Sequence, residues 1–351
     1  MGSLVHRGVS AAAIASSERP AVSVVFEIAG RFVLIESHDG TQPSGLDLLL
    51  SGFYVTPVQP SAGVTPDATI EFRRDDGLRS FDGNFDRFEV PGGGYCHTDG
   101  RSSLFDFESS RVVIHPHPSR RTEIFVKEKL DLSRAEHLQV FNYAISASLR
   151  RCGIYELHSA GVLDPQTRAG VMVVGPSGSG KSTITLQLAA AGWPYLTDDI
   201  LLLSEENGKV EARPLRRAFA VTESSVSASG HSVLADSMRG LRFGESKKRF
   251  SPHDFFASGF ASSCVPGMIY FPAVTHDQET RIRALSQSET MIRLVKMCPW
   301  ASYDRGTGST HLQILATLAR QCEAYELDAG LDVLADPTLL PRLMGTPSPG
   351  D

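Results

Sequence analysis

A glycine-rich loop between an apolar run and a helical pattern decides the fold of this chain. Residues 171–184 read Val-Met-Val-Val-Gly-Pro-Ser-Gly-Ser-Gly-Lys-Ser-Thr-Ile. The G-x-x-x-x-G-K-[ST] pattern at residues 175–182 thus follows a strand and opens a helix, which is the context that this motif requires. Glycines let successive N–H groups turn toward an anion, and the helix start adds unpaired N–H groups. The stretch predicts a nucleoside triphosphate site; the alternative is a structural Gly/Ser-rich turn.

The loop also assigns chemistry to two of its side chains. In phosphate loops of this type the lysine contacts the β- and γ-phosphates, and the following hydroxyl binds Mg²⁺. The matching residues here are Lys181 and Ser182. We therefore expect Mg²⁺ to bind together with the nucleotide.

Composition and charge limit the classes of function. The chain has 351 residues, of which 41% are hydrophobic, and a net charge of −6. This is enough apolar material for more than one domain, and it gives no global attraction to nucleic acid or anionic lipid. The five cysteines are scattered without a C-x-x-C pair, and no apolar run has the length of a membrane span. We expect a cytoplasmic protein without nucleic-acid or membrane partners; a homo-oligomer stays open.

The pattern along the chain predicts three parts. Residues 1–20 are small and polar and are expected to form a flexible tail. Residues 21–130 predict a β-rich (α+β) domain, because strand-like runs alternate with Gly, Pro and Asp turns. Residues 131–345 are predicted to form the α/β nucleotide-binding domain. The strand-like runs of the first domain are residues 31–35, 68–72, 110–114 and 122–126.

Helices and strands alternate in the second domain. Ser133 and Glu136 form a capping-box pattern before a helix that runs to about Arg151 and connects the domains. A second capping box begins at Ser286. Residues 204–263 have weak periodicity and predict loops and short elements. The other predicted elements are strands at residues 155–163, 169–174, 195–203, 266–271 and 323–327 and helices at residues 181–191 and 312–322.

Two adjacent aspartates follow the loop. Asp198 and Asp199 lie at the polar end of a strand-like run. Carboxylates in this position can hold Mg²⁺ or accept a proton from an attacking hydroxyl, and two neighbours can divide these tasks. The alternative is a solvated turn or a helix cap. The pair favours catalysis over nucleotide sensing.

Other candidate residues are a histidine and two basic clusters. His158 precedes the loop strand and could face the phosphates, or it could be a structural histidine. Lys248 and Arg249 could clamp the transferred phosphoryl group or an acidic substrate, or they could lie in a solvated loop. A second basic cluster is similar and has no stronger claim, so our preference for Lys248 and Arg249 is slight. The second cluster consists of Arg213, Arg216 and Arg217.

The order of these motifs resembles one known family. His158, the phosphate loop and the run Leu-Gln-Leu-Ala-Ala-Ala-Gly-Trp-Pro-Tyr-Leu-Thr-Asp-Asp at residues 186–199 are similar to the HPr kinase/phosphorylase catalytic domain. The resemblance covers residues 156–203, with weaker similarity at residues 247–250. It implies a mixed sheet around the phosphate loop, a fold shared with phosphoenolpyruvate carboxykinases. It also implies ATP- and Mg²⁺-dependent phosphorylation of a serine hydroxyl.

The resemblance further implies a role for each motif residue. The catalytic residues would be Lys181, His158 and the pair Asp198 and Asp199, with one aspartate as general base. Asp198 and the hydroxyl of Ser182, or alternatively that of Thr183, would hold Mg²⁺. The nucleotide-binding residues would be Gly175, Pro176, Ser177, Gly178, Ser179, Gly180, Lys181, Ser182 and Thr183.

The chain also resembles the divergent HPr-kinase-like proteins of biosynthetic gene clusters, some of which phosphorylate the precursor of a lasso peptide. The sequence therefore predicts an ATP-dependent kinase acting on a serine hydroxyl of a peptide or protein. Residues 21–130 could recruit that substrate by pairing it at a sheet edge. Two alternatives stay open: a kinase of a small-molecule hydroxyl and a non-catalytic ATP-sensing regulator.

Overall fold

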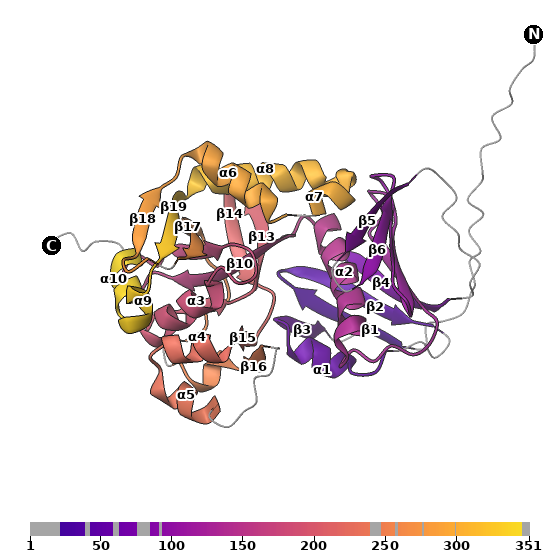
Figure 1. Ribbon diagram of the computed structural model, residues 1–351. Helices are drawn as coiled ribbons and strands as arrows, with labels where there is room; N and C mark the ends of the chain where they lie inside the picture. Colours follow the sequence, from indigo (N-terminus) through magenta and orange to yellow (C-terminus); the bar gives the residue numbers. More distant parts are fainter. Residues whose placement is uncertain are drawn as a thin grey trace, which may run out of the picture.

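The chain forms two large sheets with helices between and around them (Figure 1). The computed structural model describes residues 22–38, 43–58, 63–75, 85–90, 93–238, 247–256, 259–275, 277–298 and 300–345. The predicted tail at residues 1–20 lies outside these ranges. None of the described helices is long and apolar enough to cross a membrane.

A nine-stranded mixed sheet forms the first part, in the order β3-β1-β2-β4-β9-β8-β7-β6-β5. Its strands β2, β4 and β9 are parallel neighbours, and the other pairs are antiparallel. The four strands predicted in this part are confirmed as β2, β4, β8 and β9. The bounds are β1 Val22–Ile28, β2 Arg31–Ser37, β3 Val55–Val58, β4 Ala68–Arg74, β5 Asp86–Val90, β6 Gly94–Thr98, β7 Ser103–Asp106, β8 Ser110–Ile114 and β9 Arg121–Val126. A short helix, α1 (Leu46–Ser51), precedes β3.

Helix α2 (Ala135–Arg151) packs against β4, β8 and β9 of this first sheet. Its Phe141, Ile145 and Leu149 are buried in the same core as Phe72 and Ile124 of the sheet. The sequence places this helix in the predicted domain of residues 131–345, but the N-terminal sheet buries its apolar face. Figure 1 shows α2 on the side of that sheet that faces the second sheet.

The predicted capping box at the start of α2 is wrong. The N-cap residue is Arg134, and no side chain caps the helix there. The Ser133 hydroxyl instead donates a hydrogen bond to Asp131 Oδ1 at 2.7 Å, and the Ser133 N–H donates to the same oxygen. With Arg134 as the N-cap, Ser133 lies one position before the place that a capping box requires, and it belongs to the local turn at Asp131 instead.

An eight-stranded mixed sheet forms the second part, in the order β14-β13-β10-β11-β17-β19-β18, with β12 also paired to β10. Strands β11, β17 and β19 are parallel, and β10 is antiparallel to β11. The bounds are β10 Tyr155–Leu163, β11 Gly170–Val174, β12 Tyr195–Thr197, β13 Ile200–Glu206, β14 Lys209–Pro214, β17 Pro266–Val274, β18 Arg281–Ala284 and β19 Glu323–Ala329. A separate two-stranded sheet pairs β15 (Phe219–Val221) with β16 (Lys248–Phe250).

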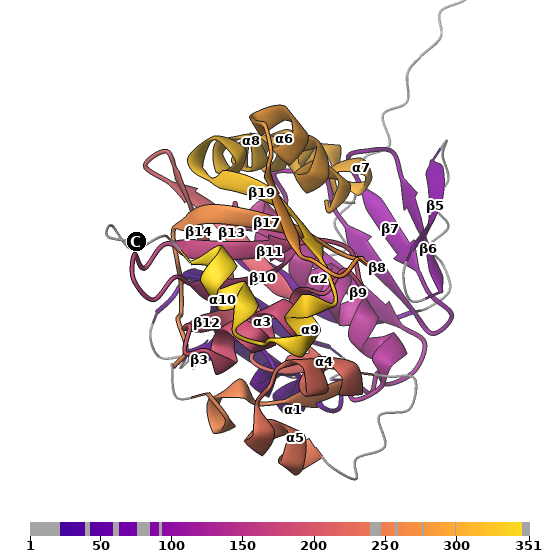
Figure 2. The ribbon, with the colours of Figure 1, turned by 60° about the vertical axis from the view of Figure 1, so that its left-hand side comes forward.

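Helices cover both faces of the second sheet. Val171 and Val173 of β11 are buried on the face of α3, whereas Met172 and Val174 are buried on the face of α8. Figure 2 shows this layering, with α6 and α8 on one face and α3, α9 and α10 on the other. The bounds are α3 Lys181–Ala190, α4 Glu223–Ala228, α5 Ser232–Met238, α6 Gln287–Lys296, α7 Trp300–Tyr303, α8 Arg305–Gln321, α9 Asp332–Ala335 and α10 Leu339–Met344. The capping box at Ser286 and the helices predicted after it are confirmed.

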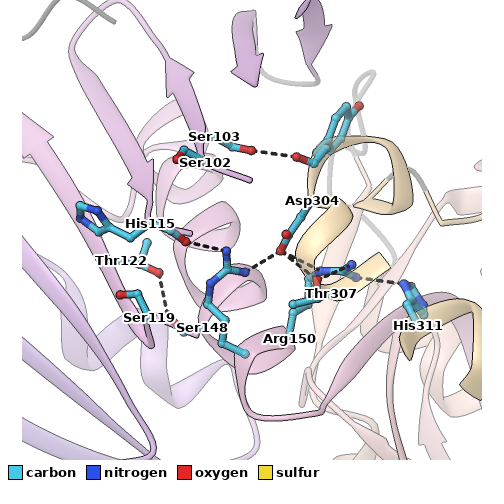
Figure 3. Close-up of polar contacts among 12 residues, drawn as sticks. Ser102, Ser103, His115, Ser119, Thr122, Ser148, Arg150, Asp304, Thr307 and His311 are labelled. Atoms are coloured by element: carbon cyan, nitrogen blue, oxygen red, sulfur yellow. Dashed lines mark hydrogen bonds and ion pairs between the residues drawn. The ribbon is translucent and has the colours of Figure 1, made fainter. Parts of the chain in front are cut away.

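Two buried arginines at the end of α2 join the two parts (Figure 3). Arg151 donates to Asp304 Oδ2 at 2.5 Å, and Arg150 donates to Thr307 Oγ1 at 3.0 Å and to His311 Nδ1 at 2.9 Å. Burial and the charge of Arg150 lower the pKa of His311 to about 3, so its ring stays neutral and can accept this bond. Buried charges are stable only when they are paired, so this network fixes the N-terminal sheet against α7 and α8.

Candidate functional site

The phosphate loop connects β11 to α3 in a conformation that depends on its glycines. Gly178 and Gly180 have φ angles of 86° and 99°, which side-chain-bearing residues rarely adopt. A Cβ atom at Gly175 would lie 2.6 Å from Ser179 Oγ. The predicted strand–loop–helix arrangement is therefore present, and its tight turn accounts for the glycines in the motif.

Lys181 lies inside the loop. Its Nζ donates to the carbonyl oxygens of Gly175 and Pro176 at 2.7 and 2.9 Å. The residue is 6% exposed, and burial lowers the pKa of its ammonium to about 8. The lysine is therefore still mostly charged at neutral pH, close to the turn where phosphates would bind.

The next two hydroxyls face different neighbours. Ser182 lies beside Asp198, where its hydrogen bond lowers the pKa of the carboxyl group. The Thr183 hydroxyl donates to Ser225 Oγ of α4 at 2.9 Å. Of the two hydroxyls that the sequence offers for Mg²⁺, Ser182 is the one on the side of the aspartates.

The aspartate pair directly follows the end of β12, as its predicted place at a strand end requires, but the single strand predicted over residues 195–203 is wrong because it is interrupted there. Strands β12 and β13 both pair with β10, and Asp198 and Asp199 occupy the interruption between them. His158 of β10 is paired with Ile200, the residue that follows the pair. The interruption turns both carboxylates out of the ladder and brings His158 beside them.

Asp198 is the buried member of the pair. It is 2% exposed, and its Oδ2 accepts a hydrogen bond from the Ala220 N–H at 2.9 Å. Burial raises the pKa of Asp198 to about 6, the charge of Asp199 adds to this, and the bonds from Ala220 and Ser182 oppose it. The buried Oδ1 has no hydrogen-bond partner among the described residues, and such an orphaned oxygen is costly.

The Asp198 carboxylate and the Ser182 hydroxyl fit Mg²⁺ as ligands. In phosphoryl-transfer sites Mg²⁺ binds through one or two carboxylates and a hydroxyl, and the substrate phosphates complete its shell. The orphaned Asp198 Oδ1 next to Ser182 matches that donor set. Over the described ranges, no group of three or more His, Cys, Asp or Glu side chains could hold a metal ion, so the fit rests on this carboxylate and hydroxyl.

Asp199 has the opposite environment. Its carboxylate oxygens lie 3.3 Å from His158 Nδ1 and 3.4 Å from Arg216 Nε, and its side chain is 32% exposed. Burial alone would raise the pKa of Asp199, but the hydrogen bond from His158 and the charge of Arg216 outweigh it and hold the pKa below its usual value. Asp199 is therefore ionised at neutral pH and open to the cavity.

The sequence alone does not distinguish Arg216 from Arg213 and Arg217. The N-terminal part holds it in place: Arg216 forms a β-bridge with Phe53, and its guanidinium lies 5.6 Å from the centre of the Phe53 ring. Arg217 donates to the Phe53 carbonyl oxygen at 2.6 Å, while Arg213 pairs with Glu211. Of the three arginines, Arg216 is the one that forms an ion pair with Asp199. Contacts between segments far apart in the sequence therefore select it for the site.

The other basic cluster contributes Lys247 and Arg249, both of which line the cavity at the aspartates. Successive side chains of a strand point to opposite faces. In β16 the residue between these two, Lys248, therefore points away from the cavity. The sequence slightly favoured Lys248 and Arg249 as the basic residues of the site. The structure places Lys247 there in place of Lys248, together with Arg249.

Two cavities lie on either side of the phosphate loop. The polar cavity, of about 380 Å³, is lined by His158, Lys181, Ser182, Asp198, Asp199 and Arg249 among others. The apolar cavity, of about 370 Å³, is formed by the loop glycines together with α3, α4 and α9. Both share Lys181, Ser182 and Lys247 as a common wall. The predicted catalytic side chains thus all meet in the polar cavity.

No protein-family model matches this sequence, and no curated protein matches it. Among solved structures, the Hpr(Ser) kinase/phosphatase from Coxiella burnetii is similar over 54% of this chain and 93% of that chain. The identity is 12% and the TM-score is 0.29. This likeness is too low to support an assignment.

Proposed function

We propose that this chain is an ATP-dependent phosphotransferase that phosphorylates a hydroxyl group, the acceptor being a serine of a peptide or protein. One observation carries the proposal: Lys181, Ser182, Asp198 and Asp199 line a single cavity at the start of α3. Phosphoryl transfer needs little covalent chemistry from the protein and depends on positioning and electrostatics. This set of groups supplies both.

The loop and Lys181 would bind the phosphates. The N–H groups of residues 177–182 and the positive end of the α3 dipole favour an anion. Lys181 adds a full charge where negative charge accumulates on the transferring group. Phosphate oxygens would replace the carbonyl oxygens of Gly175 and Pro176 as its partners.

Asp198 and Ser182 would hold Mg²⁺. The ion would supply positive charge that offsets the negative charge of the phosphates. Binding would also satisfy the orphaned Oδ1 of Asp198 and keep its carboxyl group ionised despite its burial. Asp198 is too enclosed to reach an acceptor, because it is only 2% exposed.

Asp199 would meet the acceptor hydroxyl. It is the more exposed aspartate and is already ionised, so one of its oxygens can accept the hydroxyl hydrogen bond and then the proton. His158 and Arg216 hold its carboxylate in position from two sides. Lys247 and Arg249 at the same cavity would attract the phosphates or an acidic acceptor.

A peptide acceptor is supported by the N-terminal sheet. Its edge strand β3 begins at Val55, close after the Phe53 corner that contacts Arg216, and its Thr56 and Pro57 are exposed. An extended peptide can add to such an edge through main-chain hydrogen bonds. A peptide bound at β3 would therefore lie near the polar cavity, which makes residues 21–130 the recruitment domain of this proposal.

The test measures transfer from γ-labelled ATP with Mg²⁺ to a pool of serine-containing peptides and, separately, to a pool of small-molecule alcohols and sugars. We expect label on peptide serine. The Asp199→Asn variant should lower transfer by about 10²–10⁴-fold, the usual contribution of a proton-transfer group, with an almost unchanged Kd for ATP. Label only on the small molecules would show that the acceptor is a small-molecule hydroxyl and not a peptide serine. ATP binding without transfer to either pool would support a sensing regulator instead.

A further inference from the structure

The apolar cavity opens directly beside the phosphate loop. Gly178, Gly180 and Thr183 form its floor, and α3, α4 and α9 form its walls. Figure 2 shows these three helices side by side on one face of the second sheet. The cavity is therefore lined by residues of the phosphate loop itself, so that one molecule could contact both.

Three exposed aliphatic side chains gather at this cavity. Val274, Leu331 and Leu334 are 62%, 41% and 52% exposed, and all three line it. Single exposed apolar residues are common on protein surfaces, but a group of them at one concave site marks a surface that binds something apolar. Next to a phosphate site, the ligand would have to join an apolar portion to phosphates, as a nucleotide does.

Gln187 adds a polar requirement. Its Nε2 donates to the carbonyl oxygens of Ala228 and Val333, both at 2.7 Å. These two bonds use both amide hydrogens and fix the orientation of the group. Its Oε1 is buried and has no partner among the described residues, and Gln187 lines the apolar cavity. The open position on this side chain is therefore that of an acceptor.

The spacing along α3 agrees with a nucleotide. Gln187 follows Lys181 by six residues on the same helix, which corresponds to about 9 Å along the helix axis. The phosphate-binding lysine and the unpartnered acceptor are thus separated along one wall of the cavity. A ribose could lie between a base at Gln187 and phosphates at Lys181.

We propose that the apolar cavity binds the base of the nucleoside triphosphate and selects adenine. The ring packs against Val274, Leu331 and Leu334, and the C6 amine of adenine donates to Gln187 Oε1. A 6-oxo purine places an acceptor against this acceptor, which leaves both unsatisfied. The inference rests on the proposed function, because it takes the phosphates to lie in the loop.

The first experiment varies the ligand and leaves the protein unchanged. Binding of ATP, inosine triphosphate and inorganic tripolyphosphate to the full chain is measured by calorimetry with Mg²⁺ and no acceptor. We expect ATP to bind about 10-fold or more tightly than inosine triphosphate, since an unmet hydrogen bond separates them. Inosine triphosphate should still bind more tightly than tripolyphosphate, because its ring covers the aliphatic side chains.

The second experiment varies the cavity. Leu334→Ala should weaken ATP binding about 5-fold and leave tripolyphosphate binding unchanged, because it removes apolar contact with the base only. Leu312→Ala is the matched control: Leu312 is also partly exposed, on α8, and does not line the cavity, so neither Kd should change.

The outcomes separate this inference from the proposed function. Equal Kd values for all three ligands would overturn the base pocket and leave the phosphate site standing. Equal values for ATP and inosine triphosphate, both tighter than tripolyphosphate, would overturn the selection of adenine. An effect of Leu334→Ala on tripolyphosphate as large as that on ATP would also overturn the base contact. Absence of binding by every ligand would overturn the proposed function itself.

Discussion

The polar and apolar cavities have similar volumes and share Lys181, Ser182 and Lys247, yet they differ in what they can do. The polar cavity gathers two carboxylates, a histidine and basic side chains, whereas the apolar cavity gathers aliphatic side chains around one amide. The phosphate loop and the start of α3 separate them. The difference shows how one loop can serve recognition on one side and chemistry on the other, because charges and apolar surface each need their own surroundings.

The same contrast exists within the aspartate pair. Asp198 is enclosed and has its pKa raised, and Asp199 is open and has its pKa lowered by His158 and Arg216. Neighbouring carboxylates whose environments shift their pKa values apart can take different tasks. Three predictions test these two contrasts.

The largest effect, on ATP binding, is expected from Lys181 in the wall that the two cavities share. Lys181→Ala should weaken ATP binding by about 100-fold or more, because a charge-assisted bond to phosphate is lost and both cavities depend on it. The measurement is the Kd for ATP and for tripolyphosphate with Mg²⁺. Lys248→Ala is the matched control and should change neither value, since Lys248 points away from the polar cavity. If Lys181→Ala lost transfer but kept ATP binding, the loop would not be the common phosphate site.

The second prediction concerns the stability of the protein without nucleotide. The pKa of Asp198 is raised to about 6 in the folded chain, above its unfolded value of about 4. Ionisation of the buried Asp198 carboxyl group therefore lowers the free energy of unfolding. This loss is absent below about pH 4, grows as the pH rises through this window and is complete above about pH 6. Asp198→Asn should raise the free energy of unfolding by about 2–3 kcal/mol at pH 7.5 and by little near pH 4. Denaturant unfolding at both pH values measures this.

Asp199→Asn is the control for this experiment and should act in the opposite direction. The lowered pKa of Asp199 means that its ionised form stabilises the folded chain above the unfolded pKa and loses this effect as the pH falls. Its removal should therefore destabilise the protein at pH 7.5. Equal signs for the two variants would contradict the contrast between the two aspartates. Asp198→Asn should also abolish the gain in ATP affinity from Mg²⁺.

The smallest effect is expected from the N-terminal contact. Arg216→Gln removes a charge that lowers the pKa of Asp199, so that pKa should rise. The acid limb of the kcat profile should then move to higher pH, whereas kcat at neutral pH should change little, because Asp199 stays ionised there. Arg213→Gln, three residues earlier in β14 and paired with Glu211, should leave the profile unchanged. A fall in kcat without a shift of the acid limb would assign Arg216 a purely structural role.

The elements that were predicted well are those encoded over short spans. The strand, loop and helix around residues 171–184 are recognisable because sterics require glycine in the turn and the helix follows directly. The capping box at Ser286 forms because donor and acceptor lie three residues apart. The capping box at Ser133 shows the limit of this approach, since the helix begins one residue later and Arg134 takes the N-cap position.

The elements that were missed depend on partners far away in the sequence. The break between β12 and β13 arises from pairing with β10, and no local pattern at residues 195–203 indicates it. Helix α2 shows an apolar face, but its sequence does not say which sheet will bury that face. Arg216 differs from Arg213 and Arg217 through its ion pair with Asp199.

By itself, the sequence determined the phosphate loop, the two strands before it, the helix after it and the presence of two carboxylates downstream. Glycine sterics, hydrogen-bonding groups and helix periodicity are properties of neighbouring residues, so they can be read without a fold. The tertiary structure decided which aspartate is buried, which basic side chains face them and where an apolar cavity lies. Burial, charge proximity and cavity shape arise only when distant segments pack together, and these set the pKa values and the space available to a ligand.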